Sequence, residues 1–141
     1  HLYSGLTAIE NLQVASRYLG RDASPPGLSG LLSRVGLFER AHDAVATFSA
    51  GMRKRLSLAR LLLQDPSVVF LDEPYGELDP AGFALVDGLL ADWRERGATV
   101  LLSTHLLERG RALGDLALVL ESGRLTWQGP AAELPAAGAH P

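Results

Sequence analysis

Three apolar segments in the second half of the chain predict β-strands. Val68-Val69-Phe70-Leu71-Asp72-Glu73-Pro74 runs from four apolar residues into two carboxylates and a proline. An uninterrupted apolar run that stops at a breaker is typical of a strand buried on both faces of a parallel sheet, so we expect a strand over residues 67–72. Residues 98–103 predict a second buried strand. Residues 116–120 predict a third, joined by a tight turn to residues 124–127 in a hairpin.

Helical patterns dominate the first half of the chain and connect the later strands. Thr7-Ala8-Ile9-Glu10 fits a capping box, in which a Thr hydroxyl and a Glu carboxylate bond reciprocally to the first N–H groups of a helix. Asp79-Pro80 provides an N-cap and a proline suited to the first helical position. A Pro-rich loop is predicted over residues 21–27. The predicted helices cover residues 7–19, 28–35, 50–63, 80–96 and 106–113.

The order of these elements predicts an α/β fold. Helices come first, followed by β-α-β-α-β-β, which describes a helical subdomain and then part of a mainly parallel sheet flanked by helices. We expect a helical subdomain over residues 1–64 and an α/β core over residues 65–129. Residues 130–141, rich in Ala, Pro and Gly, predict a flexible tail.

Composition narrows the class of protein. The chain has 141 residues, a net charge of −3 and no cysteine. The lack of cysteine excludes a disulfide framework and a thiolate metal site within these residues. The charge gives no basic surface, so we expect no nucleic-acid partner. No apolar run reaches the roughly 20 residues that a membrane-spanning helix needs.

Polar side chains follow two of the predicted strands and suggest nucleotide chemistry. Asp72 and Glu73 end the first strand, and Thr104-His105 ends the second. Ligands of open α/β sheets bind at this carboxyl edge, where one acid can hold Mg²⁺ and another can orient or deprotonate a water. Ser49 opens a helix whose N–H groups could hold an anion. Taken singly, Asp72 and Glu73 could be solvated acids at a strand end. His105 could be a structural histidine, and Ser49 an ordinary helix cap.

Four motifs together carry a family resemblance. Phe48-Ser49-Ala50-Gly51-Met52, the acid-ended strand Val68 to Glu73, Gly76-Glu77-Leu78-Asp79 and Thr104-His105 follow in that order. In order and spacing the chain closely resembles the nucleotide-binding domain of ABC ATPases from about residue 6 to residue 134. The resemblance implies a P-loop NTPase-like fold that binds ATP and Mg²⁺ and hydrolyses ATP. It also implies a dimer with a second ATPase subunit, with ATP sandwiched between the two.

The resemblance implies a role for each matching residue. Ser49-Ala50-Gly51-Met52 matches the signature motif, usually Leu-Ser-Gly-Gly-Gln, which grips the γ-phosphate of ATP held by the other subunit. Asp72 matches the Walker B acid, which holds Mg²⁺ through water, and Glu73 matches the catalytic base beside it. Asp79 matches the D-loop acid that works across the dimer interface, although it would cap a helix in any protein. His105 matches the switch histidine that contacts the γ-phosphate and links it to Glu73.

The chain departs from the family pattern in several places. No Gly-x-x-x-x-Gly-Lys-Ser/Thr P-loop occurs, and the one lysine, Lys54, lies outside any glycine-rich loop. We therefore expect these residues to be the later part of a longer domain and to be inactive alone. Ala50 and Met52 replace the Gly and Gln of the signature, which predicts a variant that still binds phosphate. Arg53-Lys54-Arg55 predicts a solvated face of the signature helix.

Finer features resemble one branch of the family. The stretch from Leu2 to Leu12, the Ser-Ala-Gly signature and the stretch from Leu78 to Gly82 look like the ATPase subunit of the haem exporter of cytochrome c biogenesis. ATPases of drug and polysaccharide exporters share much of these three sequence features. The resemblance implies a subunit that powers export through a separate transmembrane permease, docked on residues 1–64. It would be cytoplasmic and peripheral on the inner face of the cell membrane. The alternatives are an ABC-type ATPase of DNA repair or translation and a non-catalytic interaction domain.

Overall fold

The structure, a computed structural model, describes residues 1–21 and 24–135, which form two compact units. The first, here the helical unit, comprises His1–Val68 and Tyr75–Leu85. The second, here the sheet unit, comprises Val69–Pro74 and the described residues from Val86 onward. Helices and two small sheets follow one another along the chain, so the predicted α/β fold class is confirmed.

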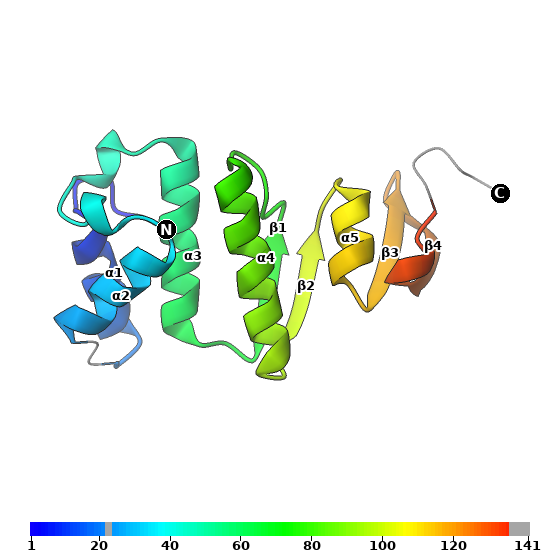
Figure 1. The fold of residues 1–141 in the computed structure, drawn as a ribbon, viewed down its shortest axis with the longest axis horizontal. Coiled ribbons are helices and arrows are strands. Elements are labelled where there is room, and N and C mark those ends of the chain that lie inside the picture. The colour runs from blue at the N-terminus through cyan, green and yellow to red at the C-terminus, as the bar shows by residue number, and fades with distance from the viewer. Residues whose placement is uncertain (22–23, 136–141) are drawn as a thin grey trace. The chain divides into compact units, whose positions relative to one another are not determined.

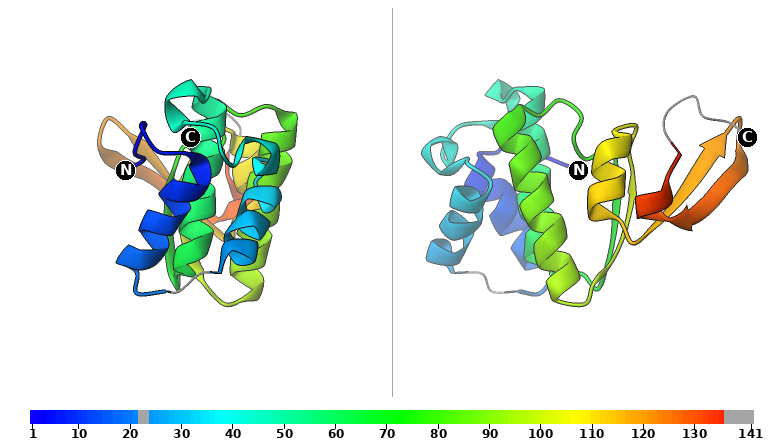
Figure 2. Two further views of the ribbon diagram at one scale, coloured as in Figure 1. Left: turned by 90° about the vertical axis from the view of Figure 1, so that its left-hand side faces the viewer. Right: turned by 45° about the vertical axis from the view of Figure 1, so that its right-hand side comes forward.

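Three packed helices make up most of the helical unit: α1 (Ala8–Tyr18), α2 (Pro25–Arg34) and α3 (Ala50–Gln64). Each contacts the other two, and the ribbon views show them lying side by side (Figures 1 and 2). Apolar positions at helical spacing face inward and remove their surface from water, which stabilises the unit. The most deeply buried members of this core are Ala8, Leu12, Leu28, Leu32, Leu56 and Ala59.

The start of α1 is fixed by side chains that replace missing helical hydrogen bonds. The Glu10 N–H donates to the Thr7 hydroxyl at 3.3 Å, and the Thr7 N–H donates to the Glu10 carboxylate at 2.8 Å, which confirms the predicted capping box. The N–H and hydroxyl of Thr7 hold the pKa of Glu10 below its usual value. Asn11, which is buried, donates to the Tyr3 carbonyl at 3.0 Å and accepts from the Tyr3 N–H at 2.8 Å. These bonds tie the preceding segment to the helix.

Helix α2 begins earlier than its apolar pattern indicates. The expected loop over residues 21–27 gives way to helix at Pro25, because a proline in the first turn lacks only an N–H that would have no helical partner anyway. Residues 22 and 23 of that loop lie outside the described part of the chain. The segment before α3 contains two short 3₁₀ turns, η1 (Phe38–Arg40) and η2 (Val45–Thr47).

The sheet unit is built around two strands that run in the same direction in Figure 1, β1 (Val68–Asp72) and β2 (Thr99–Ser103). They are joined through α4 (Pro80–Glu95), whose residues 86–95 belong to this unit and lie along one side of the pair (Figures 1 and 2). Apolar side chains are buried in this part of the structure, namely Val69, Val86, Leu89, Leu90 and Trp93.

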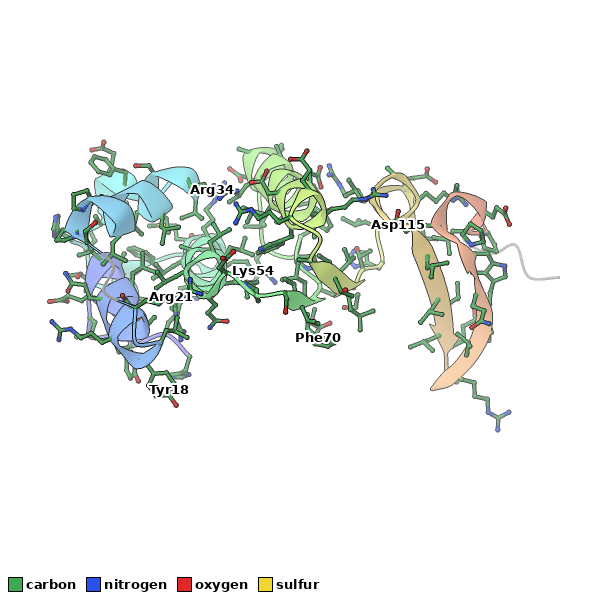
Figure 3. The ribbon with its side chains drawn as sticks, turned by 90° about the horizontal axis from the view of Figure 1, so that it is seen from below. Tyr18, Arg21, Arg34, Lys54, Phe70 and Asp115 are labelled. Carbon is green, nitrogen blue, oxygen red and sulfur yellow. The ribbon has the colours of Figure 1, made fainter. Side chains whose placement is uncertain are left out.

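The prediction that β1 and β2 are buried on both faces is wrong for this structure. Val68 is 50% exposed, Phe70 72% and Leu101 54%. Figure 3 shows the Phe70 side chain pointing outward from β1. Successive strand side chains point to opposite faces. In the described residues, apolar neighbours cover one face of the pair and leave the other open, so only Val69 of β1 is fully buried.

The final elements are helix α5 (Leu107–Leu113) and a hairpin of β3 (Leu116–Glu121) and β4 (Arg124–Pro130). The hairpin is antiparallel, as predicted, and forms a sheet of its own with a register shift after Val119. Ser122 and Gly123 form its two-residue turn with φ of 49° and 75°. Positive φ at both turn residues matches the twist of the flanking strands.

The first residues of the expected tail are ordered. The short turn η3 (Ala131–Glu133) follows β4, and both Ala131 and Leu134 are buried. The Ala131 N–H donates to the Asp115 carbonyl at 3.0 Å, and the Arg111 side chain donates to the Leu134 carbonyl at 2.8 Å. Ala131 and Leu134 are thus hydrogen-bonded to the segment before β3, and a flexible tail from residue 130 stays a prediction. Residues 136–141 lie outside the described part.

The predicted boundaries at residues 64 and 129 stay a prediction. The segment Tyr75–Leu85, which we placed in the core by sequence, groups with the helical unit. No described helix combines the length and apolar character that crossing a bilayer requires.

The capping box at the start of α1 predicts the effect of one substitution. Thr7→Ala removes the hydroxyl that accepts the Glu10 N–H and should lower the free energy of unfolding by about 1 kcal/mol. Thr7→Ser keeps the hydroxyl and should lie close to wild type. Urea unfolding followed by circular dichroism measures both. Equal stability of the Thr7→Ala variant and the wild type would show that the box contributes nothing.

Candidate functional site

The polar residues singled out by the sequence fall into two clusters, one in each unit. The acidic cluster, in the sheet unit, consists of the predicted residues Asp72, Glu73 and His105 together with Ser103, which the sequence did not single out. It forms where β1 and β2 end beside each other, since the carboxyl ends of neighbouring parallel strands lie at the same edge of a sheet.

Hydrogen bonds hold the acidic cluster together. The Ser103 hydroxyl donates to Oδ1 of Asp72 and accepts the Glu73 N–H at 3.1 Å. The same Glu73 N–H also lies 3.1 Å from the Ser103 carbonyl oxygen. Glu73 has a φ of 43°, in the left-handed region that residues other than glycine adopt infrequently. Ser103 thus hydrogen-bonds to the backbone of Glu73, the residue of the cluster with a left-handed φ.

The Glu73 carboxylate is paired with an imidazole. Nδ1 of His105 lies 3.0 Å from Oε2 of Glu73, and the His105 side chain is 76% exposed. With its proton on Nδ1, the ring donates to the carboxylate and leaves Nε2 free to act on a second group. A carboxylate held in this way can orient a water or accept its proton.

The cluster suits Mg²⁺ in its donor atoms. Carboxylate and hydroxyl oxygens are hard ligands, and Mg²⁺ is usually bound through one or two carboxylates, with water and phosphate oxygens completing its shell. Within residues 1–21 and 24–135, no set of three or more His, Asp or Glu side chains converges to hold a metal ion alone. Asp72 would therefore share such an ion with water and phosphate.

The second cluster, here the signature cluster, lies at the start of α3 in the helical unit. Ser49 is the N-cap, and its hydroxyl accepts the Met52 N–H at 3.1 Å. An α-helix leaves its first N–H groups without intrahelical partners, and its dipole adds positive potential at that end. The start of α3, at Ala50 and Gly51, is thus suited to an anion.

The loop before α4 packs closely on this helix start. A Cβ added to Gly51 would lie 2.7 Å from the Glu77 carbonyl oxygen, nearer than such atoms normally approach. Only glycine fits there without movement of the loop. Glu77 itself has a φ of 66°. The signature cluster and the loop that carries Asp79 are therefore parts of one packed arrangement.

Asp79 is held from two sides. Its Oδ1 accepts the Gly82 N–H at 2.8 Å, which confirms its predicted position as a cap of α4, and pairs with the Arg55 guanidinium at 2.7 Å. The Gly82 N–H and, after it, the Arg55 bond hold the pKa of Asp79 below its usual value. Arg55 also donates to the Val35 carbonyl at 3.1 Å. The pair connects α3 with the loop before α4.

The structure brings Asp72, Glu73 and His105 together in the sheet unit. It brings Ser49-Ala50-Gly51-Met52 together with the loop of Asp79 in the helical unit. The interpretation of Arg53-Lys54-Arg55 as a solvated face is wrong for Arg55, whose side chain is only 17% exposed and pairs with Asp79. The signal available in the sequence was the position of Arg55 four residues after Gly51, which places the two residues on one face of α3. Ser103 was missed, although it directly precedes Thr104-His105.

Comparison with known proteins shows to which family this chain belongs. The model of the ABC transporter family matches residues 1–76. The ABC transporter ATP-binding protein YhcH of Bacillus subtilis (strain 168) is 42% identical over 88% of this chain and 41% of its own length. A fluoroquinolones export ATP-binding protein, MT2762 of Mycobacterium tuberculosis (strain CDC 1551 / Oshkosh), is 40% identical over 87% of this chain and 40% of its own. An aliphatic sulfonates import ATP-binding protein, SsuB 1 of Burkholderia lata, is also 40% identical, over 88% of this chain and 38% of its own.

Comparison of the fold with solved structures also matches an ATP-binding cassette. The dimeric post-hydrolysis state of the ATP-binding cassette MJ0796, bound to ADP and Pi, matches with a TM-score of 0.81 and 25% identity over 93% of this chain and 59% of that one. The chain spans about two fifths of the length of the curated relatives that it matches. Because the family model covers more than half of its residues, this chain belongs to the ABC transporter family, within the ATP-binding domain.

Proposed function

We propose that this chain forms part of the ATP-binding and ATP-hydrolysing subunit of an ABC transporter. One observation carries the catalytic part of the proposal. The carboxylate of Glu73 lies 3.0 Å from His105 and directly follows Asp72 at the carboxyl end of β1. That arrangement provides a base, a group to orient it and an acid suited to Mg²⁺ within one cluster.

Each residue of the acidic cluster has a distinct task in this proposal. Glu73 orients the attacking water and accepts its proton. His105 donates from Nδ1 to hold that carboxylate and presents Nε2 toward the γ-phosphate. Asp72 holds Mg²⁺ through water. When bound, the ion neutralises charge that develops on the phosphate oxygens.

The signature cluster is proposed to act on a partner subunit. Ser49, Gly51 and the helix-start N–H groups of α3 bind the γ-phosphate of ATP held by a second ATPase subunit, with Asp79 working across the same interface. Ala50 and Met52, which replace Gly and Gln, leave the Ser49 cap intact in the structure. The matching cassette is a dimer bound to ADP and Pi, which supports this arrangement.

The membrane partner and the direction of transport are inferred from relatives. We propose a separate transmembrane permease as the partner, with this chain at the cytoplasmic face of the membrane and the permease docked on its helical part. Export is favoured, since matching proteins include exporters of fluoroquinolones and of Nod factor. A sulfonate importer of similar identity weakens that inference. Haem as the cargo finds no support in these relatives' names, and transporter names disfavour a role in DNA repair or translation.

Hydrolysis is proposed to need residues beyond these 141. These 141 residues contain no P-loop, whose N–H groups and lysine hold the β- and γ-phosphates in such enzymes. Tests of turnover therefore use what we call the extended protein, this chain preceded by a segment that contains a P-loop.

Glu73→Gln in the extended protein tests the catalytic proposal. Gln cannot accept the proton of water, so ATP turnover should fall by roughly 10² to 10⁴-fold. ATP-driven dimerisation should persist, because Gln keeps the size of the side chain. Glu95→Gln, the same change at an exposed position at the end of α4, is the matched control and should retain turnover. Native turnover by the Glu73→Gln variant would remove Glu73 from its proposed role.

Gly51→Ala tests the close contact within the signature cluster. The new Cβ would meet the Glu77 carbonyl oxygen, so the free energy of unfolding of this chain should fall by about 1–3 kcal/mol. The extended protein should dimerise more weakly with ATP, because the helix start shifts.

The control for this change is Gly88→Ala in α4, where an added Cβ has open space. That variant should be as stable as wild type or more so, by up to about 1 kcal/mol, since Ala is the better helix former. Denaturant unfolding measures both variants. If Gly51→Ala behaved like Gly88→Ala, the contact with Glu77 would not be tight.

A further inference from the structure

We propose that Ser103 is a positioning residue that holds both acids of the cluster, Asp72 and Glu73, in their working geometry. The inference rests on the proposed function of that cluster and adds a residue to it. Ser103 is the last residue of β2, while the two acids follow one another at the end of β1. Its side chain is the one that hydrogen-bonds to both of them among the described residues.

The hydroxyl uses its donor and its acceptor capacity at the same time. A serine hydroxyl has one hydrogen to give and lone pairs to accept with. The hydrogen goes to Oδ1 of Asp72, and the oxygen accepts the Glu73 N–H at 3.1 Å. One small group therefore fixes the rotation of the Asp72 carboxylate and the position of the Glu73 backbone.

The backbone contact of Ser103 is with Glu73, whose conformation is an uncommon one. Glu73 adopts a left-handed φ of 43°, and residues other than glycine persist in that conformation only where their surroundings hold them. The Glu73 N–H is shared between the hydroxyl and the carbonyl oxygen of Ser103, both at 3.1 Å. The conformation in turn places the Glu73 side chain against His105.

These contacts imply that metal binding and base catalysis are coupled through Ser103. Loss of the hydroxyl frees the Asp72 carboxylate to rotate and removes one of the two acceptors of the Glu73 N–H. Both acids remain in the chain, but neither is held as before. Because Ser103 is exposed, truncating it leaves no cavity in a core, and the fold should survive.

The test compares Ser103→Ala with Ser103→Thr in the extended protein. Ala lacks the hydroxyl, whereas Thr keeps it and suits a strand end. For Ser103→Ala we expect the Mg²⁺ concentration for half-maximal ATP turnover to rise about tenfold and kcat to fall about tenfold, as the loss of a hydrogen bond to a charged group implies. Ser103→Thr should stay within about threefold of wild type in both. Ser33→Ala, at an exposed serine of α2, is the matched control.

The outcomes separate this inference from the function on which it rests. If Glu73→Gln abolishes turnover while Ser103→Ala keeps the wild-type Mg²⁺ dependence and kcat, Ser103 has no positioning role and the inference is overturned. If Ser103→Ala loses only stability against denaturant, with the Mg²⁺ dependence unmoved, its role is structural and the inference fails too. Native turnover by Glu73→Gln would instead overturn the proposed function. A shifted Mg²⁺ dependence that Thr restores supports the inference.

Discussion

The pairing of β1 with β2 is the constraint on which the proposed chemistry depends. The two strands are separated by α4 in the sequence, yet their last residues meet at one edge because both run in the same direction. That edge brings Asp72 and Glu73 from one strand to Ser103 and, just beyond the second strand, His105. The Glu73 N–H donates to the carbonyl oxygen and to the hydroxyl of Ser103. The same N–H group therefore joins the ends of the two strands and positions Glu73 in the acidic cluster.

The signature cluster is held together mainly by the close packing of two backbone segments, the start of α3 and the loop before α4. Gly51 allows the loop at Glu77 to lie against the start of α3, and Arg55 ties Asp79 to the same helix. Ser49 then caps the helix through the Met52 N–H. The start of α3 is thus held against this loop by Gly51, whose lack of a side chain admits the loop, and by Arg55.

Local signals in the sequence predicted much of this structure. The capping box at Thr7 and Glu10, the helix of α3 and the cap at Asp79 all depend on neighbours close in sequence, and all three are confirmed. The predictions failed where residues distant in sequence determine the burial or the partner of a side chain. Phe70 belongs to an apolar run that predicts burial, but its exposure depends on what covers the face of the strand. Arg55 lies in a basic run that predicts solvent, yet its partner Asp79 is 24 residues away in sequence. For Ser103, whose partners are on another strand, no local pattern revealed the contact.

We propose that these residues supply the catalytic acids and the signature cluster, while a P-loop in another part of the protein holds the phosphates of ATP. Calorimetric titration of Mg-ATP into this chain and into the extended protein tests that claim most directly. We predict that the extended protein binds Mg-ATP and that this chain alone shows no measurable heat of binding. Tight binding by the chain alone would contradict the account, because it would mean that these residues hold phosphates without a P-loop.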